Sequence, residues 1–268
     1  MSTLLERAGW EVTGSFDARF TALAEVRAQL GARGFAESAF TCARSDHGPE
    51  RQVGLDGWVL VVEEDPDRLM DVLPLIDGIE RDPDAETRWS AAHLLAATSD
   101  VRAAQALCRF AGDVDGDVRW QVAFGLPAMI RRGPGEPTPP TETLIALTRD
   151  PDAHIRDWAT FGLGVSTDLD GPTIREALRQ RLSDQGGETA GEALVGLARR
   201  RDPIAAPTVI ARVAAGHVGN LVVMAAEELA DPTLCSALRD LRDSGWHDAS
   251  FPDLLDRALR ACGCEAPP

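Results

Sequence analysis

Aromatic and acidic side chains recur together in the middle of this chain of 268 residues, and both kinds of side chain can bind cations. Indole faces attract cations through the quadrupole of the ring, and carboxylates attract them through charge. A surface that carries both could receive a cationic or aromatic segment of another molecule, or stabilise a positive charge that develops in a reaction. The candidates are Glu86, Trp89, His93, Asp117, Trp120, Phe124, His154, Asp157, Trp158 and Phe161.

These residues belong to a segment that occurs four times in register. It reads DPDAETRWSAAHLL from Asp82, DVDGDVRWQVAFGL from Asp113, DPDAHIRDWATFGL from Asp150 and DQGGETAGEALVGL from Asp184. Self-similarity at such a period is typical of solenoids, in which each unit buries its apolar face only against its neighbours. The sequence therefore predicts a repeat array.

Each copy has the periodicity of a helix when residues are counted from the leading Asp as zero. Positions 5, 9 and 13, such as Thr87, Ala91 and Leu95, form a narrow, mostly apolar stripe that should face the core. Positions 4, 7 and 11 lie on the opposite side, and they hold nine of the ten candidates, with Trp158 at the border. We therefore predict that the candidates line a groove. A structural alternative is that Trp89, Trp120 and Phe161 fill gaps between adjacent repeats.

The stripe recurs twice more, at Leu221 and near Leu255, and a shorter apolar run precedes each copy. The prediction is an all-α fold, an α-solenoid of about six helix pairs over residues 65–268. The segment RRGPGEPTPP is predicted to be a loop, because its prolines and glycines exclude regular structure.

Residues 1–64 lack the repeat. A helix is predicted from Asp17 to Gly31, then a loop over SDHGPERQVGLDG, then a short strand in GWVLVVEED from Gly57. This region is either a cap on the first repeat or a small separate α/β module.

The segments DPDAETRWSAAHLL and IRDWATFGLG resemble HEAT repeats of the short bacterial type also found in phycobilisome lyases, over roughly residues 65–262. The resemblance implies antiparallel helix pairs whose second helices line a concave side. It also implies a structural ladder in which the Arg at position 6 pairs with the Asp of a neighbouring unit. The ladder residues are Asp82, Arg88, Asp113, Arg119, Asp150 and Arg156, and Ala190 should interrupt the ladder in the fourth copy.

The formal net charge is -16, and all 27 basic residues are arginines. Such a surface repels nucleic acid and anionic membranes, and it suits a basic or neutral protein partner. No apolar run is long enough to cross a bilayer, so we expect a cytoplasmic protein.

Cysteine and histidine spacing predicts neither disulfides nor metals. The cysteines number five, an odd total, and the tail pair Cys262 and Cys264 is expected to remain as free thiols. His93 and His154 lie on different repeats without a matching third ligand, so no metal or other cofactor is expected.

Three classes of function remain. A non-enzymatic adaptor or scaffold that binds a protein in the groove is favoured, since no catalytic pattern is found. One alternative resembles HEAT-like bacterial DNA glycosylases for alkylated bases, with Trp120, Asp157 and Trp158 imitating the residues that stabilise a cationic sugar. The net negative charge of the chain argues against this alternative, because it repels the phosphates of DNA. The other alternative is a bilin lyase or isomerase subunit, by fold analogy alone.

Overall fold

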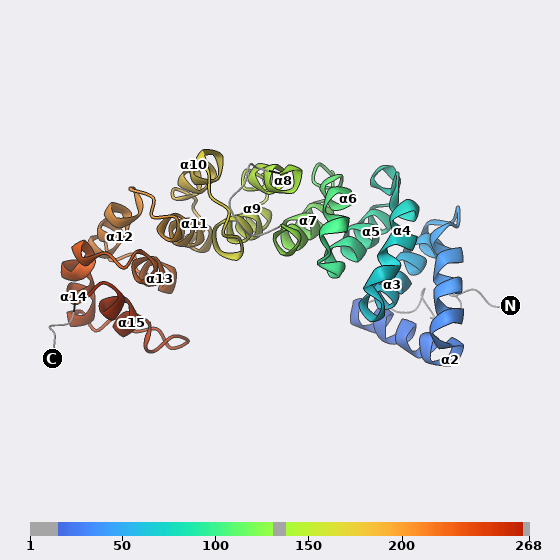
Figure 1. Cartoon of the computed structure of the whole chain (residues 1–268), viewed down its shortest axis with the longest axis horizontal. Coiled ribbons are helices and arrows are strands. Elements are labelled where there is room, and N and C mark those ends of the chain that lie inside the picture. Colours follow the sequence, from blue (N-terminus) through green and yellow to red (C-terminus); the bar gives the residue numbers. More distant parts are fainter. Residues whose placement is uncertain (1–15, 131–137, 265–268) are drawn as a thin grey trace. The chain divides into compact units, whose positions relative to one another are not determined.

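The computed structural model describes residues 16–130 and 138–264, and all regular secondary structure in these residues is helical (Figure 1). The prediction of an all-α fold is therefore confirmed. The helices form two compact units, residues 1–131 and 132–268. Most of the predicted loop RRGPGEPTPP, residues 131–137, lies outside the described residues. None of the described helices is long and apolar enough to span a membrane.

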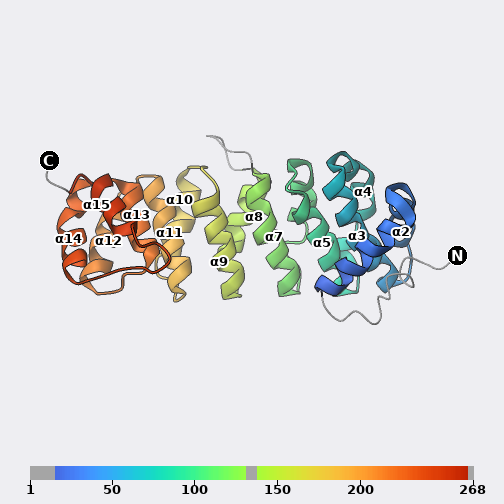
Figure 2. The same ribbon diagram turned by 90° about the horizontal axis from the view of Figure 1, so that it is seen from below.

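The described residues of unit 1 form three helix pairs. The second helices α3, α5 and α7 pack side by side in that order (Figure 2). The first helix α6 packs against both α5 and α7. Short 3-10 turns lead into or out of the short first helices. The bounds are α2 (Phe16–Ala43), α3 (Gly48–Glu64), α4 (Leu69–Ile76), α5 (Ala85–Thr98), α6 (Ala104–Cys108) and α7 (Gly116–Met129).

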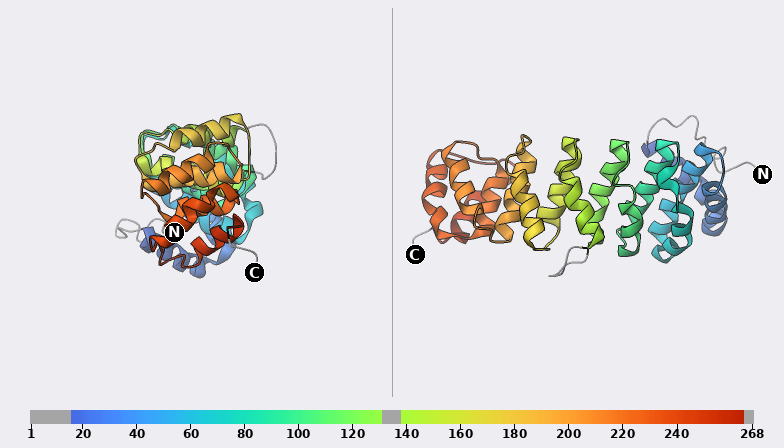
Figure 3. Two further views of the ribbon diagram at one scale, coloured as in Figure 1. Left: turned by 90° about the vertical axis from the view of Figure 1, so that its left-hand side faces the viewer. Right: turned by 90° about the horizontal axis from the view of Figure 1, so that it is seen from above.

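Four helix pairs make up the described part of unit 2. The second helices α9, α11, α13 and α15 pack in sequence order, and the first helices form the other layer, visible from the opposite side (Figure 3, right). With the two later pairs of unit 1, the described residues after 65 contain the six predicted pairs. The bounds are α8 (Pro139–Leu147), α9 (Ala153–Phe161), α10 (Pro172–Arg181), α11 (Gly187–Arg199), α12 (Ala205–Ala214), α13 (Asn220–Leu229), α14 (Cys235–Asp243) and α15 (Leu254–Ala261).

The predicted apolar stripe forms the core. Positions 5, 9 and 13 are 0–3% exposed in all four copies. Glycines at position 12 of the copies allow close approach of neighbouring helices. A Cβ on Gly196 would lie 2.6 Å from the Cα of Gly164, and one on Gly125 would lie 2.6 Å from the Cβ of Ala96.

The two aspartates that open a copy fold the turn between helices. The carboxylate of Asp82 accepts a hydrogen bond from the backbone N–H of Asp84, at 2.9 Å, and Asp84 in turn caps α5. Arg88 donates to the backbone carbonyl of Asp82, at 2.8 Å, and its Nε donates to the carboxylate of Asp113, at 2.7 Å. A single guanidinium therefore fixes its own turn and ties it to the next repeat.

The same arrangement recurs along the chain and changes at the fourth copy. Arg156 pairs with Asp184 at 3.0 Å, and Arg51 pairs with Asp82 at 2.7 Å. Ala190 has no guanidinium to offer, and the leading position of the next copy is Gly216, which has no carboxylate to receive one. Asp202, at the turn between α11 and α12, is held instead by Arg175 and Arg179 of α10.

The N-terminal predictions need correction. Residues 48–64 form the single helix α3, so both the loop and the strand predicted there are wrong. Pro49 occupies the first turn of α3, where its missing N–H costs no hydrogen bond. The valines of this run are buried between α2 and α5, and a short buried apolar run does not distinguish strand from helix. The division of the chain at residue 64 stays a prediction.

Gly31 does interrupt the first helix, as predicted. Its φ of 71° is in the left-handed region, which glycine adopts at low cost, and the helix resumes after it to Ala43.

A buried arginine closes the end of α9. The helix ends in a π-helical turn, Gly162–Ser166, where backbone carbonyls lack helical partners. The Arg200 side chain, which follows α11, donates to two carbonyls of this turn, to two of the segment after it and to one of α11. Burial lowers the pKa of Arg200 to about 10, so it is cationic at neutral pH. The acceptors, at 2.7–3.1 Å, are the carbonyl oxygens of Leu163, Gly164, Thr167, Leu169 and Gly196.

Candidate functional site

The candidate residues of unit 1 lie on α5 and α7 and form two stacked pairs. Trp89 stacks on His93 with ring centroids 4.9 Å apart and an interplanar angle of 8°. Trp120 stacks on Phe124 at 5.2 Å and 15°. Each pair joins positions 7 and 11 of one helix, which are neighbours on its surface. The Phe124 side chain is 46% exposed, so this surface presents an aromatic edge to solvent.

The first turn of α2 covers the α5 pair. Phe20 meets His93 edge-on at 5.9 Å, and the Arg19 guanidinium lies 6.0 Å from the Trp89 ring. Arg19 also lies 3.8 Å from the Glu86 carboxylate. Within unit 1, therefore, a cation already occupies the kind of aromatic and acidic surface that the sequence predicted for a partner.

Buried polar groups lie beneath this surface. Asp56 of α3 is 0% exposed, and burial raises its pKa to about 7, although Ser90 and Arg19 oppose the rise. Burial also lowers the pKa of His93, against the effect of its hydrogen bond with Gln121. These side chains belong to successive second helices.

Asp56 makes the stability of unit 1 depend on pH. Its folded pKa of about 7 lies above the ordinary value of 3.8, so the folded state binds this proton more tightly. The contribution of Asp56 to the stability is fully present below pH 3.8 and is lost as pH rises through 7. Between pH 5 and 8 we expect the unfolding free energy of the wild type to fall by about 2–4 kcal/mol, and Asp56→Asn should abolish this decrease. Urea denaturation at both pH values measures it.

The control for this experiment is Glu63→Gln, on the exposed side of the same helix. It should keep the pH dependence of the wild type. If the Asp56→Asn protein lost stability between pH 5 and 8 as much as the wild type does, the buried carboxyl would not be the cause.

The candidates of unit 2 lie on α9. Trp158 contacts His154 and Phe161 edge-on, at 6.3 and 6.0 Å between ring centroids. Phe161 is 36% exposed. Asp157 accepts a hydrogen bond from the Thr189 hydroxyl of α11, at 2.7 Å.

Carboxylates of α11 join this surface. The pKa of Glu192 is raised to about 8 by burial and by the charges of Asp157 and Glu188. We call Asp157, Glu188 and Glu192, with the rings of Trp158 and Phe161, the α9–α11 face. The three carboxylates repel one another, and a bound cation would relieve this repulsion.

The predicted groove residues thus share surfaces within each unit: those of α5 and α7 in unit 1, and those of α9 in unit 2. A continuous groove through all of them stays a prediction.

Sequence reasoning missed Arg19, Phe20, Asp56 and Glu192. Asp56 could have been found by extending the register backwards, because Ser45 and Arg51 repeat the spacing of Asp82 and Arg88, which puts Asp56 at position 11. Glu192 is at position 8, outside the three positions assigned to the groove.

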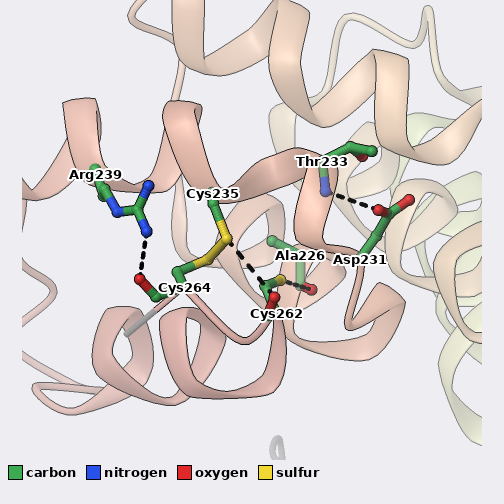
Figure 4. Close-up of a disulfide and its surroundings, with 7 residues drawn as sticks. All are labelled: Ala226, Asp231, Thr233, Cys235, Arg239, Cys262 and Cys264. Atoms are coloured by element: carbon green, nitrogen blue, oxygen red, sulfur yellow. Dashed lines mark hydrogen bonds between the residues drawn. A yellow bond between two sulfur atoms is a disulfide. The ribbon is translucent and has the colours of Figure 1, made fainter. Parts of the chain in front are cut away.

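The cysteine prediction is wrong for Cys264. It forms a disulfide with Cys235 at the start of α14 (Figure 4). Cys262 keeps its thiol, which donates to the carbonyl of Ala226 at 3.4 Å. The antiparallel packing of α14 and α15 brings together residues 29 positions apart, a pairing that an odd cysteine count cannot reveal.

Comparison with known proteins gives relatives for the fold. Protein YibA of Escherichia coli (strain K12) is 32% identical over 95 residues, which are 35% of this chain and only 34% of YibA. The X-ray structure of YibA matches with a TM-score of 0.74 and 19% identity, covering 97% of this chain and 92% of that one. An engineered protein matches with a TM-score of 0.55 and 14% identity, covering 97% and 78%. No known family profile matches the chain.

Proposed function

Because the chain is a HEAT-like repeat protein, we propose that it is a non-enzymatic adaptor that binds a basic segment of another protein on the faces of its second helices. The observation that carries the proposal is the α9–α11 face, where the pKa of Glu192 is raised to about 8 beside Asp157 and Glu188. A partner's arginine or lysine would neutralise this cluster while its stem packs on the Trp158 and Phe161 rings.

The Arg19 contact in unit 1 supports this choice of partner chemistry. There, the chain places its own guanidinium against Trp89 and Glu86. The same combination of an indole and a carboxylate on α9 and α11 suits a guanidinium from another molecule. The net charge of -16 favours the approach of a basic partner and opposes duplex DNA.

The proposal is tested by recovering cross-linked partners from the native cell with three proteins. Wild type and Glu176→Gln, which alters an exposed carboxylate on α10, should recover the same partner. The double variant Glu188→Gln with Glu192→Gln should lose it, because the cation then meets neutral amides. Equal recovery by all three proteins would place the interaction elsewhere.

The affinity for that partner should rise with pH. A bound cation favours the ionised form of Glu192, whose pKa in the free protein is about 8, so binding releases a proton. Affinity therefore increases between pH 6.5 and 9, by about tenfold if the bound pKa falls by one unit. Isothermal titration calorimetry in buffers of different ionisation enthalpy measures the released proton. A pH-independent affinity would contradict the role of Glu192.

A further inference from the structure

A separate cavity of about 380 Å³ lies in unit 2, at the turns that join α8 to α9 and α10 to α11. Three guanidiniums line it, those of Arg149, Arg156 and Arg181, together with the carboxylates of Asp150 and Asp184. Such a concentration of cations is unexpected in a protein with a net charge of -16.

Asp184 is already saturated with donors. It accepts hydrogen bonds from Arg156 Nε at 3.0 Å, from Arg181 at 3.3 Å and from the backbone N–H of Gly186 at 3.2 Å. Hydrogen bonding by Arg156, foremost, lowers the pKa of Asp184, so it is ionised at neutral pH. This carboxylate is therefore shared between Arg156 and Arg181, and among the described residues no ion pair joins it to Arg149.

Arg149 and Arg181 keep unused donors. Arg149 Nε donates to the neutral side chain of Gln180, at 3.1 Å, and within the described residues no acceptor is found for its terminal nitrogens. The Nε of Arg181 is buried and has no hydrogen-bond partner among the described residues. A buried N–H without an acceptor is costly, so an acceptor from outside would be favoured at this position.

The corresponding turns of unit 1 carry a charged pair. Four residues before the leading Asp113 stands Arg109, and it pairs with Asp77 at 2.8 Å and approaches Glu80 at 3.9 Å. In unit 2 the residue four before Asp184 is Gln180, and the counterparts of Asp77 and Glu80 are Ile145 and Thr148, so these positions carry no charge. Arg149 and Arg181 stand at other positions of the turns, and the two carboxylates that serve Arg109 have no counterpart beside them.

We propose that this cavity binds an oxyanion, held between the guanidiniums of Arg149 and Arg181. A phosphate monoester or a carboxylate offers the oxygen acceptors that the two side chains lack, and guanidinium groups bind both in a bidentate manner. The site lies at the inter-helix turns and is separate from the α9–α11 face, so it does not depend on the adaptor function.

The test is an NMR titration of the full-length ¹⁵N-labelled protein with inorganic phosphate, and in parallel with acetate, at constant ionic strength. Saturable shifts of amides in residues 149–151 and 181–186 are expected, with a dissociation constant on the order of 1 mM for phosphate. Arg149→Gln should weaken binding by about tenfold or more, since it removes a charge-assisted hydrogen-bond donor group. Tighter binding of phosphate would assign the site to phosphate esters, and tighter binding of acetate to carboxylates; both support an oxyanion site.

Gln180→Glu gives a sharper variant, because it is isosteric and places a carboxylate against Arg149. This internal anion should abolish binding without affecting the fold. Matched controls lie in unit 1: Arg33→Gln removes one positive charge, and Gln105→Glu adds one negative charge, both at exposed positions. Neither should change the shifts. Absence of saturable shifts in the wild type, or equal shifts in Arg149→Gln and Gln180→Glu, would overturn the proposal.

Discussion

Replacing Arg200 with methionine is expected to lower the unfolding free energy of unit 2 by about 3–5 kcal/mol, although no surface residue changes. Arg200 is 8% exposed and its guanidinium donates to five backbone carbonyls, four in the segment that ends α9 and one in α11. Methionine fills much of the volume but removes these donors, and of the five acceptors Leu163 keeps a hydrogen bond from the Thr167 hydroxyl. Chemical denaturation followed by tryptophan fluorescence measures the loss.

The control is Arg201→Met, the same substitution on the neighbouring exposed side chain. It should change stability by less than about 0.5 kcal/mol. A loss in Arg200→Met no larger than in the control would show that water or a backbone shift satisfies the carbonyls.

Opening the Cys235–Cys264 disulfide is the second change with a large expected effect. The bond closes a loop with a sequence separation of 29, for which the chain-entropy relation gives a stabilisation of about 3–4 kcal/mol. Dithiothreitol should lower the midpoint of denaturation of the wild type and should expose the amides of α14 and α15 to hydrogen exchange before those of α9 and α11.

The Cys235→Ser protein provides the control. It should match the reduced wild type, and dithiothreitol should have no further effect on it. If reductant destabilised both proteins equally, another thiol or the reductant itself would be the cause. In a reducing cytoplasm the pair would be open, so the same measurement on protein isolated from the native cell reports its compartment.

Periodicity predicted the repeat region well because each repeat uses the same local physics. The stripe of Thr87, Ala91 and Leu95 is buried since steps of four residues stay on one side of a helix, and the paired aspartates recur because every turn needs a cap. The secondary structure of residues 48–64 was predicted wrongly, because their apolar run does not alternate with polar residues and so fits a helix as well as a strand. The position of Arg51, which matches that of Arg88 in the repeat, was the better signal for a helix.

The site was harder to predict because its decisive features are tertiary. The contact of Arg19 with Trp89 joins helices separated in sequence, and no local pattern relates them. Likewise, the raised pKa of Glu192 depends on Asp157 from the preceding second helix, and on a degree of burial that helical-wheel position alone does not specify. The aromatic residues were identifiable by type, but their neighbours were not.

The Arg88 contact couples the unfolding of two repeats. Its turn is completed by a carboxylate of the following repeat, so unfolding of either repeat leaves a buried charge, Arg88 or Asp113, unpaired in the other. Loss of structure should therefore spread from one repeat to its neighbour rather than stop at the turn between them. The α14 and α15 pair is held together by a covalent bond instead, which does not depend on such an ion pair.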